Sequence, residues 1–279
     1  ALINYALIFG YWGMPELGLQ GAAIASVIAV TLSLLGFVIY IQIYFPEQEM
    51  FARFWRFDRM AIVSVAGLAL PISATALAES GLFAASAFMM GWLGHLELAA
   101  HGIVLQLAAL TFMVHMGLSQ AGTIRVGKAF ARRDWAAVRR TAVVTMGLSA
   151  MAALTAIFFF LVTPHMLISA FLNVNDILTP EILRIGTLLL IVAAMFQFVD
   201  AAQVVALSLL RGLQDTKVPM LIATVSYWLI GLPISYVLGF VLNYREIGVW
   251  LGLVFGLGIA AVLLWARFSV LTRPGFGRV

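Results

Sequence analysis

Long apolar runs, separated by short polar stretches, dominate the 279 residues of the chain. A membrane-spanning helix needs about 20 predominantly apolar residues, whereas a strand of a membrane barrel alternates apolar and polar positions. The runs here are long and do not alternate, so they predict helices. Reading for them gives eight segments, at 1–12, 18–44, 59–92, 97–124, 141–163, 181–211, 219–243 and 247–268.

The composition supports the same interpretation. Hydrophobic residues make up 63% of the chain, charged residues only 10%, and the mean hydropathy is +1.07. Soluble domains are about 45–50% apolar and about 25% charged, so an ordinary soluble domain is excluded. The predicted fold class is therefore all-α, a polytopic membrane protein with about eight transmembrane segments. The chain has no cysteine, which excludes disulfides and thiolate metal sites.

The first segment, "ALINYALIFGYW", is too short to span a bilayer. Twelve helical residues cover about 18 Å, against a hydrocarbon core of about 30 Å. The segment begins with Ala and lacks a charged region before it, so it does not look like a signal peptide. We expect the chain to start inside a helix, as a fragment of a longer protein.

Two stretches share a pattern that suggests an internal repeat. Residues 4–21 and 235–252 each carry a polar–Tyr pair in an apolar run, then a short loop and an apolar–Gly opening. If they correspond, the repeat unit has six helices, and repeats of this kind are common in transporters. The predicted organisation is residues 1–44 as the end of an N-terminal lobe, 45–58 as a cytoplasmic linker and 59–279 as a complete C-terminal lobe of six helices.

Basic residues are concentrated in alternate connections. The connections between spans alternate between the two faces of the membrane, and one face has only Arg184 and Arg245. The second set of connections has fourteen basic residues: Arg53, Arg56, Arg59, Arg125, Lys128, Arg132, Arg133, Arg139, Arg140, Arg211, Lys217, Arg267, Arg273 and Arg278. The positive-inside rule predicts that the second set and the C-terminus are cytoplasmic, at the inner membrane of the cell. The stretch 125–140 is interpreted as a cytoplasmic loop whose arginines reach lipid headgroups, rather than as a nucleic-acid surface.

Two of the twelve acids fall deep inside predicted spans, Glu79 in 59–92 and Asp200 in 181–211. A charged group there costs about 2.5–3.5 kcal/mol or more. An interhelical hydrogen bond from a protonated carboxyl is the structural alternative, but such bonds contribute only about 0.6 kcal/mol, and Ser, Thr or Asn would supply one at lower cost. The functional interpretation is a site that binds a proton or another cation, such as sodium, in turn. Direct contact between the two acids does not follow from the sequence.

Residues on the same helix faces are candidates for the lining of a substrate cavity. Thr75 and Phe83 lie one turn from Glu79, while Phe196, Gln197 and Gln203 flank Asp200. Aromatic faces beside carboxylates suit organic cations, although ordinary packing would also explain the two phenylalanines. Among the histidines, only His115 is kept as a candidate for the pathway. The others, His95, His101 and His165, are expected in loop or packing roles.

Several blocks resemble the multidrug and toxic compound extrusion (MATE) family, in its NorM-like branch. They include "ALAESGLFAASAFMMGWLG", "TIRVGKA", "FQFVDAAQVVALSLLRGLQDTKVPM" and "YWLIGLPISYVLGF", in the family's order. The resemblance implies twelve helices in two six-helix lobes, of which this chain would hold the last two helices of the first lobe and all of the second. It also implies exchange of inward sodium or protons for outward drugs, often organic cations, without an enzymatic step or a resident cofactor.

The same resemblance implies that Glu79 and Asp200 match the family's second-lobe cation site, and that Phe83 matches an aromatic linked to it. The chain differs at two positions, with Phe196 where some relatives have Tyr and Gly102 where many have Gln. The first-lobe acid that some branches use for proton coupling would lie upstream of residue 1.

Two other functions were considered. An exporter of lipid-linked sugars or other polyanions would need basic residues along its cavity, whereas most basic residues here lie at one face of the membrane. An intramembrane enzyme or photoreceptor would need a mid-helix Lys, a pair of membrane aspartates or an H-E-x-x-H motif, and the sequence has none of these. The preferred function is cation-coupled multidrug efflux.

Overall fold

The computed structural model describes residues 2–13, 15–48, 57–172 and 178–273, and all regular structure within them is helical. The chain divides into two compact units, Ala1–Ala61 and Ile62–Val279. Most of the predicted 45–58 linker lies outside the described residues. The assignment of the two units to two lobes of a transporter remains a prediction.

The first unit is a helical hairpin of α1 (Leu2–Phe9) and α2 (Gly18–Tyr44). Between them, η1 (Tyr11–Gly13) forms a turn, and η2 (Pro46–Gln48) follows α2. The Leu17 amide donates to the Leu7 carbonyl at 3.1 Å, and the rings of Tyr5 and Tyr11 stack with centroids 4.9 Å apart. The segment predicted at 1–12 is thus an eight-residue helix followed by a turn.

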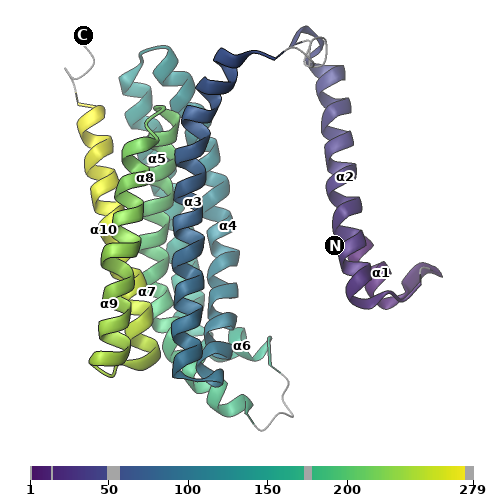
Figure 1. The fold of residues 1–279 in the computed structure, drawn as a ribbon, viewed down its shortest axis with the longest axis vertical. Coiled ribbons are helices and arrows are strands. Elements are labelled where there is room, and N and C mark those ends of the chain that lie inside the picture. Colours follow the sequence, from purple (N-terminus) through teal and green to yellow (C-terminus); the bar gives the residue numbers. More distant parts are fainter. Residues whose placement is uncertain (1, 14, 49–56, 173–177, 274–279) are drawn as a thin grey trace. The chain divides into compact units, whose positions relative to one another are not determined.

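The second unit is a bundle whose long helices run side by side (Figure 1). Its elements are α3 (Arg59–Leu93, in this unit from Ile62), α4 (His95–Ala131), α5 (Trp135–Val162), α6 (Pro164–Ser169), α7 (Thr179–Gly212), α8 (Lys217–Thr224), η3 (Val225–Gly231), α9 (Leu232–Tyr236), η4 (Val237–Val241) and α10 (Arg245–Leu271). The elements from Lys217 to Val241 form one continuous helix, of which η3 and η4 are π-helical. Across the described residues, seven helices are long and apolar enough to cross a membrane, each corresponding to one of the predicted segments after 1–12.

The basic stretch 125–140, predicted as a loop, is instead almost entirely helical. The helix α4 continues to Ala131 and α5 begins at Trp135, which leaves a turn of three residues. Arg133 adopts a left-handed conformation with φ of 57°, and Asp134 caps α5 by accepting the Ala137 amide at 2.9 Å. Hydropathy falls before the helix ends, because a helix can extend beyond the hydrocarbon core as a polar segment.

The helix α7 lies at the centre of the bundle, where it packs against α4, α5 and α10. Its apolar side chains Leu189, Leu190 and Leu209 are fully buried, as are Leu253 and Leu257 of α10. A buried helix face is expected to be apolar. The buried polar side chains of α7, which are Gln197, Asp200, Gln203 and Ser208, are therefore exceptional.

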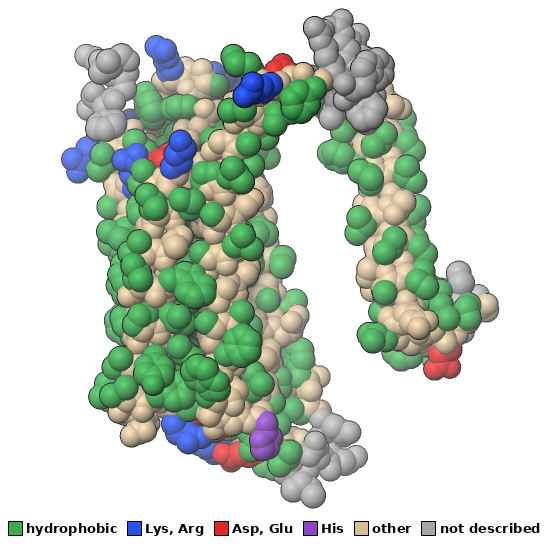
Figure 2. All heavy atoms as spheres, in the orientation of Figure 1, with side chains coloured by type: hydrophobic (Ala, Val, Ile, Leu, Met, Phe, Trp, Pro, Cys, Tyr) green, Lys and Arg blue, Asp and Glu red, His purple; other side chains and the backbone are tan. Residues whose placement is uncertain are grey.

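The sides of the second unit are covered by exposed apolar side chains, and its charged side chains gather at the two ends (Figure 2). Val143, Leu154, Leu229 and Val262, for example, are between 59% and 72% exposed. Soluble proteins rarely expose apolar surface on this scale. Such a surface is suited to contact with lipid chains, which are apolar. Helices can enter lipid because their backbone hydrogen bonds are made within each helix.

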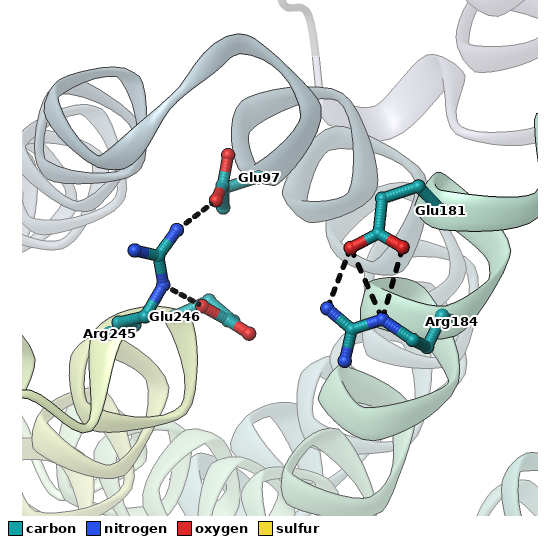
Figure 3. Close-up of polar contacts among 5 residues, drawn as sticks. All are labelled: Glu97, Glu181, Arg184, Arg245 and Glu246. Carbon is teal, nitrogen blue, oxygen red and sulfur yellow. Dashed lines mark hydrogen bonds and ion pairs between the residues drawn. The ribbon is translucent and has the colours of Figure 1, made fainter. Parts of the chain in front are cut away.

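Ion pairs join helix ends at the end of the bundle where α4, α7 and α10 begin (Figure 3). Arg245 pairs with Glu97 of α4 and lies 3.4 Å from Glu246, whereas Arg184 and Glu181 of α7 pair with each other at 2.7 Å. Glu97 and Glu246 are buried, at 9% and 7% exposed. One arginine therefore neutralises two buried carboxylates and connects α4 to α10.

Replacing Arg245 with Gln should lower the free energy of unfolding by about 2 kcal/mol, because two buried carboxylates would lose their shared cation. The measurement is the midpoint of thermal unfolding in detergent. Arg184→Gln is the matched control, because it removes the same charge from an exposed pair within one helix and should have little effect. Equal shifts for the two variants would contradict the role assigned to Arg245.

Candidate functional site

A cavity of about 470 Å³ opens between α3, α4 and α7. Eleven residues line it: Ala76, Glu79, Ser80, Phe83, Leu105, Ala108, Ala109, Phe112, Met116, Phe196 and Asp200. The wall is mostly apolar, with two carboxylates and one hydroxyl. A concave, largely apolar pocket with a few convergent polar groups is the usual form of a small-molecule site.

Helical spacing explains how each helix contributes to the wall. Glu79 and Phe83 lie one turn apart on α3, and Phe196 and Asp200 lie one turn apart on α7. Residues four apart share a helix face, so each helix presents a carboxylate and an aromatic ring together. On α4 the residues facing them include Ala108 and Ala109, whose small side chains leave open volume.

The two carboxylates carry polar atoms without partners among the described residues. The Oε1 atom of Glu79 and the Oδ1 atom of Asp200 are both buried without a hydrogen bond. Asp200 is 2% exposed, and the two groups interact electrostatically. Since buried polar groups are normally satisfied, a pair of unsatisfied carboxyl oxygens beside open volume is suited to a bound cation or proton.

An aromatic row runs from the cavity into the bundle. The rings of Phe83 and Phe196 meet edge to face with centroids 6.0 Å apart, and Phe196 meets Trp250 of α10 in the same manner at 5.7 Å. The Trp250 indole donates to Nδ1 of His101 at 3.1 Å. This row fixes the ring beside Asp200, because each member is held by the next.

Four residues predicted for the cavity do not line it. Thr75 is buried and donates its hydroxyl to the Pro71 carbonyl at 2.9 Å, while Gln203 donates to the Tyr227 hydroxyl at 2.6 Å. His115 bonds through Nδ1 with Ser149 of α5 at 2.8 Å and also interacts with Gln197 of α7. Gln197 is fully buried beside His115.

Basic side chains do not contribute to the lining of this cavity. Arg211, in the last turn of α7, is half-buried and interacts electrostatically with Glu79 without lining the cavity. The sequence placed Arg211 at the cytoplasmic end of the segment 181–211, and the structure includes it in the last turn of α7. The cavity itself therefore presents two carboxyl groups and aromatic faces.

Three functional candidates were missed in the sequence. Trp250 was not singled out, Tyr227 had no recognised partner, and His101 was assigned a generic loop or packing role. Spacing within one helix gave no signal for them, because their contacts are with other helices. Trp250 contacts Phe196 and donates to His101, and Tyr227 accepts from Gln203. His101 does pack, but as the support of the aromatic row.

Comparison with known proteins adds independent evidence. The MatE family model matches residues 71–237. The chain is 42% identical over 274 residues to the "Probable multidrug resistance protein NorM" of Agrobacterium fabrum, covering 98% of this chain and 59% of the relative. A second protein of that name, from Rhizobium meliloti, is 41% identical over 280 residues, with coverage of 98% and 59%. The chain thus spans about three fifths of the length of these curated relatives.

Among solved structures, the eukaryotic MATE transporter AtDTX14 superposes with a TM-score of 0.78 at 16% identity, covering 96% of this chain and 58% of that one. Identity at this level establishes a shared fold alone. The sequence relatives and the family model carry the assignment further, because they match most of the chain and include both carboxylates of the cavity within their aligned range. The chain belongs to the MatE family.

Proposed function

We propose that the chain forms part of a multidrug efflux transporter that exchanges an inward cation, sodium or a proton, for an outward drug. The single observation that carries the proposal is the cavity of the second unit, in which two unsatisfied carboxyl groups and three aromatic rings face the same volume. Relatives of similar sequence are named as probable multidrug resistance proteins, which supports drugs as the substrate class.

The proposed cycle follows from the charge of the cavity. When both carboxyl groups are ionised, the cavity attracts an organic cation by Coulomb attraction and by contact with the faces of Phe83 and Phe196. Binding of the coupling cation at Glu79 and Asp200 neutralises the cavity and releases the drug on the outer side. Alternating access then returns the cation to the cytoplasm, and the emptied carboxylates accept the next drug.

Export of lipid-linked or other polyanionic substrates is the alternative, and the cavity disfavours it. Phosphate and carboxylate substrates need arginine or lysine side chains in the wall, and none of the lining residues is basic. One solved structure is described by the words "Reverse polarity of binding pocket suggests different function of a MOP superfamily transporter from Pyrococcus furiosus". It superposes with a TM-score of 0.78 at 18% identity, covering 98% of this chain and 61% of that one. Pocket polarity is thus the property that should separate the two functions.

We also propose a location, an orientation in the membrane and partners for the protein. The distribution of basic residues supports an inner-membrane location with the C-terminus in the cytoplasm. The first unit would belong to an N-terminal lobe that supplies the opposite wall of the pathway. The partners are then the lipid bilayer, the organic-cation substrates and the rest of the same polypeptide, with no nucleic acid.

The test is transport by the full-length protein reconstituted in lipid vesicles. A fluorescent organic cation should move against its gradient when sodium or a proton gradient is imposed, and the effective gradient identifies the coupling ion. A fluorescent anion of similar size should not move. Transport of the anion, or movement of neither probe under either gradient, would overturn the proposal.

Replacing Phe83 with Leu should raise the KM for an organic cation about fivefold, since a cation–π contact contributes about 0.5–2 kcal/mol. Leucine keeps the apolar volume but has no ring face. Phe88→Leu is the matched control, because Phe88 lies on the same helix, is 69% exposed and does not line the cavity. Initial rates of transport over a range of probe concentrations give the comparison, and equal KM values for both variants would exclude the aromatic contact.

A further inference from the structure

A second recess lies on the outer surface of the bundle between α4 and α5, with a volume of about 160 Å³. Apolar side chains line its length, and two arginines stand at one end. The apolar members are Leu118, Ala121, Val144 and Leu148, the arginines are Arg125 and Arg140, and Gly122, Thr141 and Thr145 complete the lining. Val144 and Leu148 are 53% and 46% exposed, so the recess is accessible from the side of the bundle that faces lipid.

The two arginines have no carboxylate partner among the described residues. The nearest acid along the chain, Asp134, accepts the Ala137 amide as the cap of α5, and Asp215 is paired with Arg267 at 2.9 Å. Arg139, beside Arg140, donates to the Thr272 carbonyl at 2.8 Å. Positive charge therefore accumulates at the end of the recess without neutralisation by the protein.

We propose that this recess binds an anionic phospholipid, with its phosphate between Arg125 and Arg140 and an acyl chain along Leu118, Ala121, Val144 and Leu148. The guanidinium group matches a phosphate in charge and in bidentate geometry, and basic pockets between helices near the membrane surface bind lipid headgroups. A hydrocarbon chain accounts for the apolar wall that adjoins the charged end. Inorganic phosphate would use only the arginines, so both parts of the recess favour a lipid.

Native mass spectrometry of the purified protein in neutral detergent tests the proposal. Dioleoyl phosphatidylglycerol should bind at least about tenfold more tightly than dioleoyl phosphatidylcholine. The double variant Arg125→Gln/Arg140→Gln should weaken phosphatidylglycerol binding about thirtyfold, since each basic residue near an anionic lipid contributes a factor of about five. The control Arg132→Gln/Arg133→Gln removes the same charge from the adjacent turn, outside the recess, and should change affinity by less than about threefold.

A further variant keeps all charges and tests the apolar wall. Ala121→Phe fills the recess from the exposed face of α4 and should weaken phosphatidylglycerol binding about tenfold. If the double variant does not fold, this variant still tests whether the recess binds the lipid. Inorganic phosphate at millimolar concentration should not displace the lipid. Equal binding of the two lipids, equal loss in the control double variant, no effect of Ala121→Phe, or displacement by inorganic phosphate would each overturn the proposal.

Discussion

Glu79→Gln and Asp200→Asn are each expected to reduce cation-driven drug efflux by about thirtyfold or more. The amides keep the size of the carboxyl groups, but they cannot exchange a proton or bind a cation by charge. Loss of one partner from a desolvated charge pair costs about 2–5 kcal/mol, and every 1.4 kcal/mol is a factor of ten. The measurement is the initial rate of efflux from vesicles under whichever gradient drives the wild-type protein.

The control for this pair is Glu181→Gln, which neutralises an exposed carboxylate on the same helix as Asp200. It should leave efflux unchanged. Thermal stability provides a second control, because a neutral amide is less costly to bury than a carboxylate and the cavity variants should unfold no earlier than wild type. Efflux at the wild-type rate in either cavity variant would refute the cation site.

The apolar runs predicted the number and order of the long helices, because a chain in lipid must satisfy its backbone within each helix. They did not predict where the helices end. Arg125 and Lys128 extend α4 beyond the apolar run, and Arg139 and Arg140 lie in the first turns of α5. Hydropathy detects the part of a helix that lies in hydrocarbon, whereas capping by Asp134 and a left-handed Arg133 determine the turn.

The part of the candidate site that lies within one helix could be predicted from the sequence. A carboxylate and a ring four residues apart must share a helix face, so Glu79 with Phe83 and Phe196 with Asp200 followed from spacing. That the two faces meet in one cavity depends on how α3 and α7 pack, and no pattern within one helix encodes it. For the same reason Gln203 was paired with Asp200 by spacing, although its partner is Tyr227 on a different helix.

Glycines of α10 form a close helix contact in the second unit. A methyl group added at Gly256 would lie 2.8 Å from the Gly231 Cα atom, and one at Gly248 would lie 2.5 Å from the Gly239 nitrogen. At Gly252, halfway between them, it would overlap the Ser235 nitrogen and Cα. Small residues four apart let helices approach in membranes, and here they place the backbone of α10 against the helix from Lys217 to Val241.

Gly252→Ala is therefore expected to lower the free energy of unfolding by about 2 kcal/mol. Alanine favours a helix over glycine by about 1 kcal/mol, but its methyl group would meet backbone atoms that cannot rotate away, and such overpacking costs about 1–3 kcal/mol or more. The displaced helices would also strain the hydrogen bond from the Ser235 hydroxyl to the Val249 carbonyl, which is 3.0 Å long. The measurement is the thermal unfolding midpoint in detergent.

The matched control is Gly258→Ala, on the same helix. Its added methyl group would lie 3.5 Å from Cγ1 of Val199, which is an ordinary contact, so only the gain in helix propensity remains and stability should be unchanged or slightly higher. Opposite signs for two identical substitutions six residues apart would demonstrate that contact with the neighbouring helix, rather than propensity, determines the need for glycine. A stability loss of equal size at both positions would contradict the close approach at Gly252, because the second position has no backbone to meet.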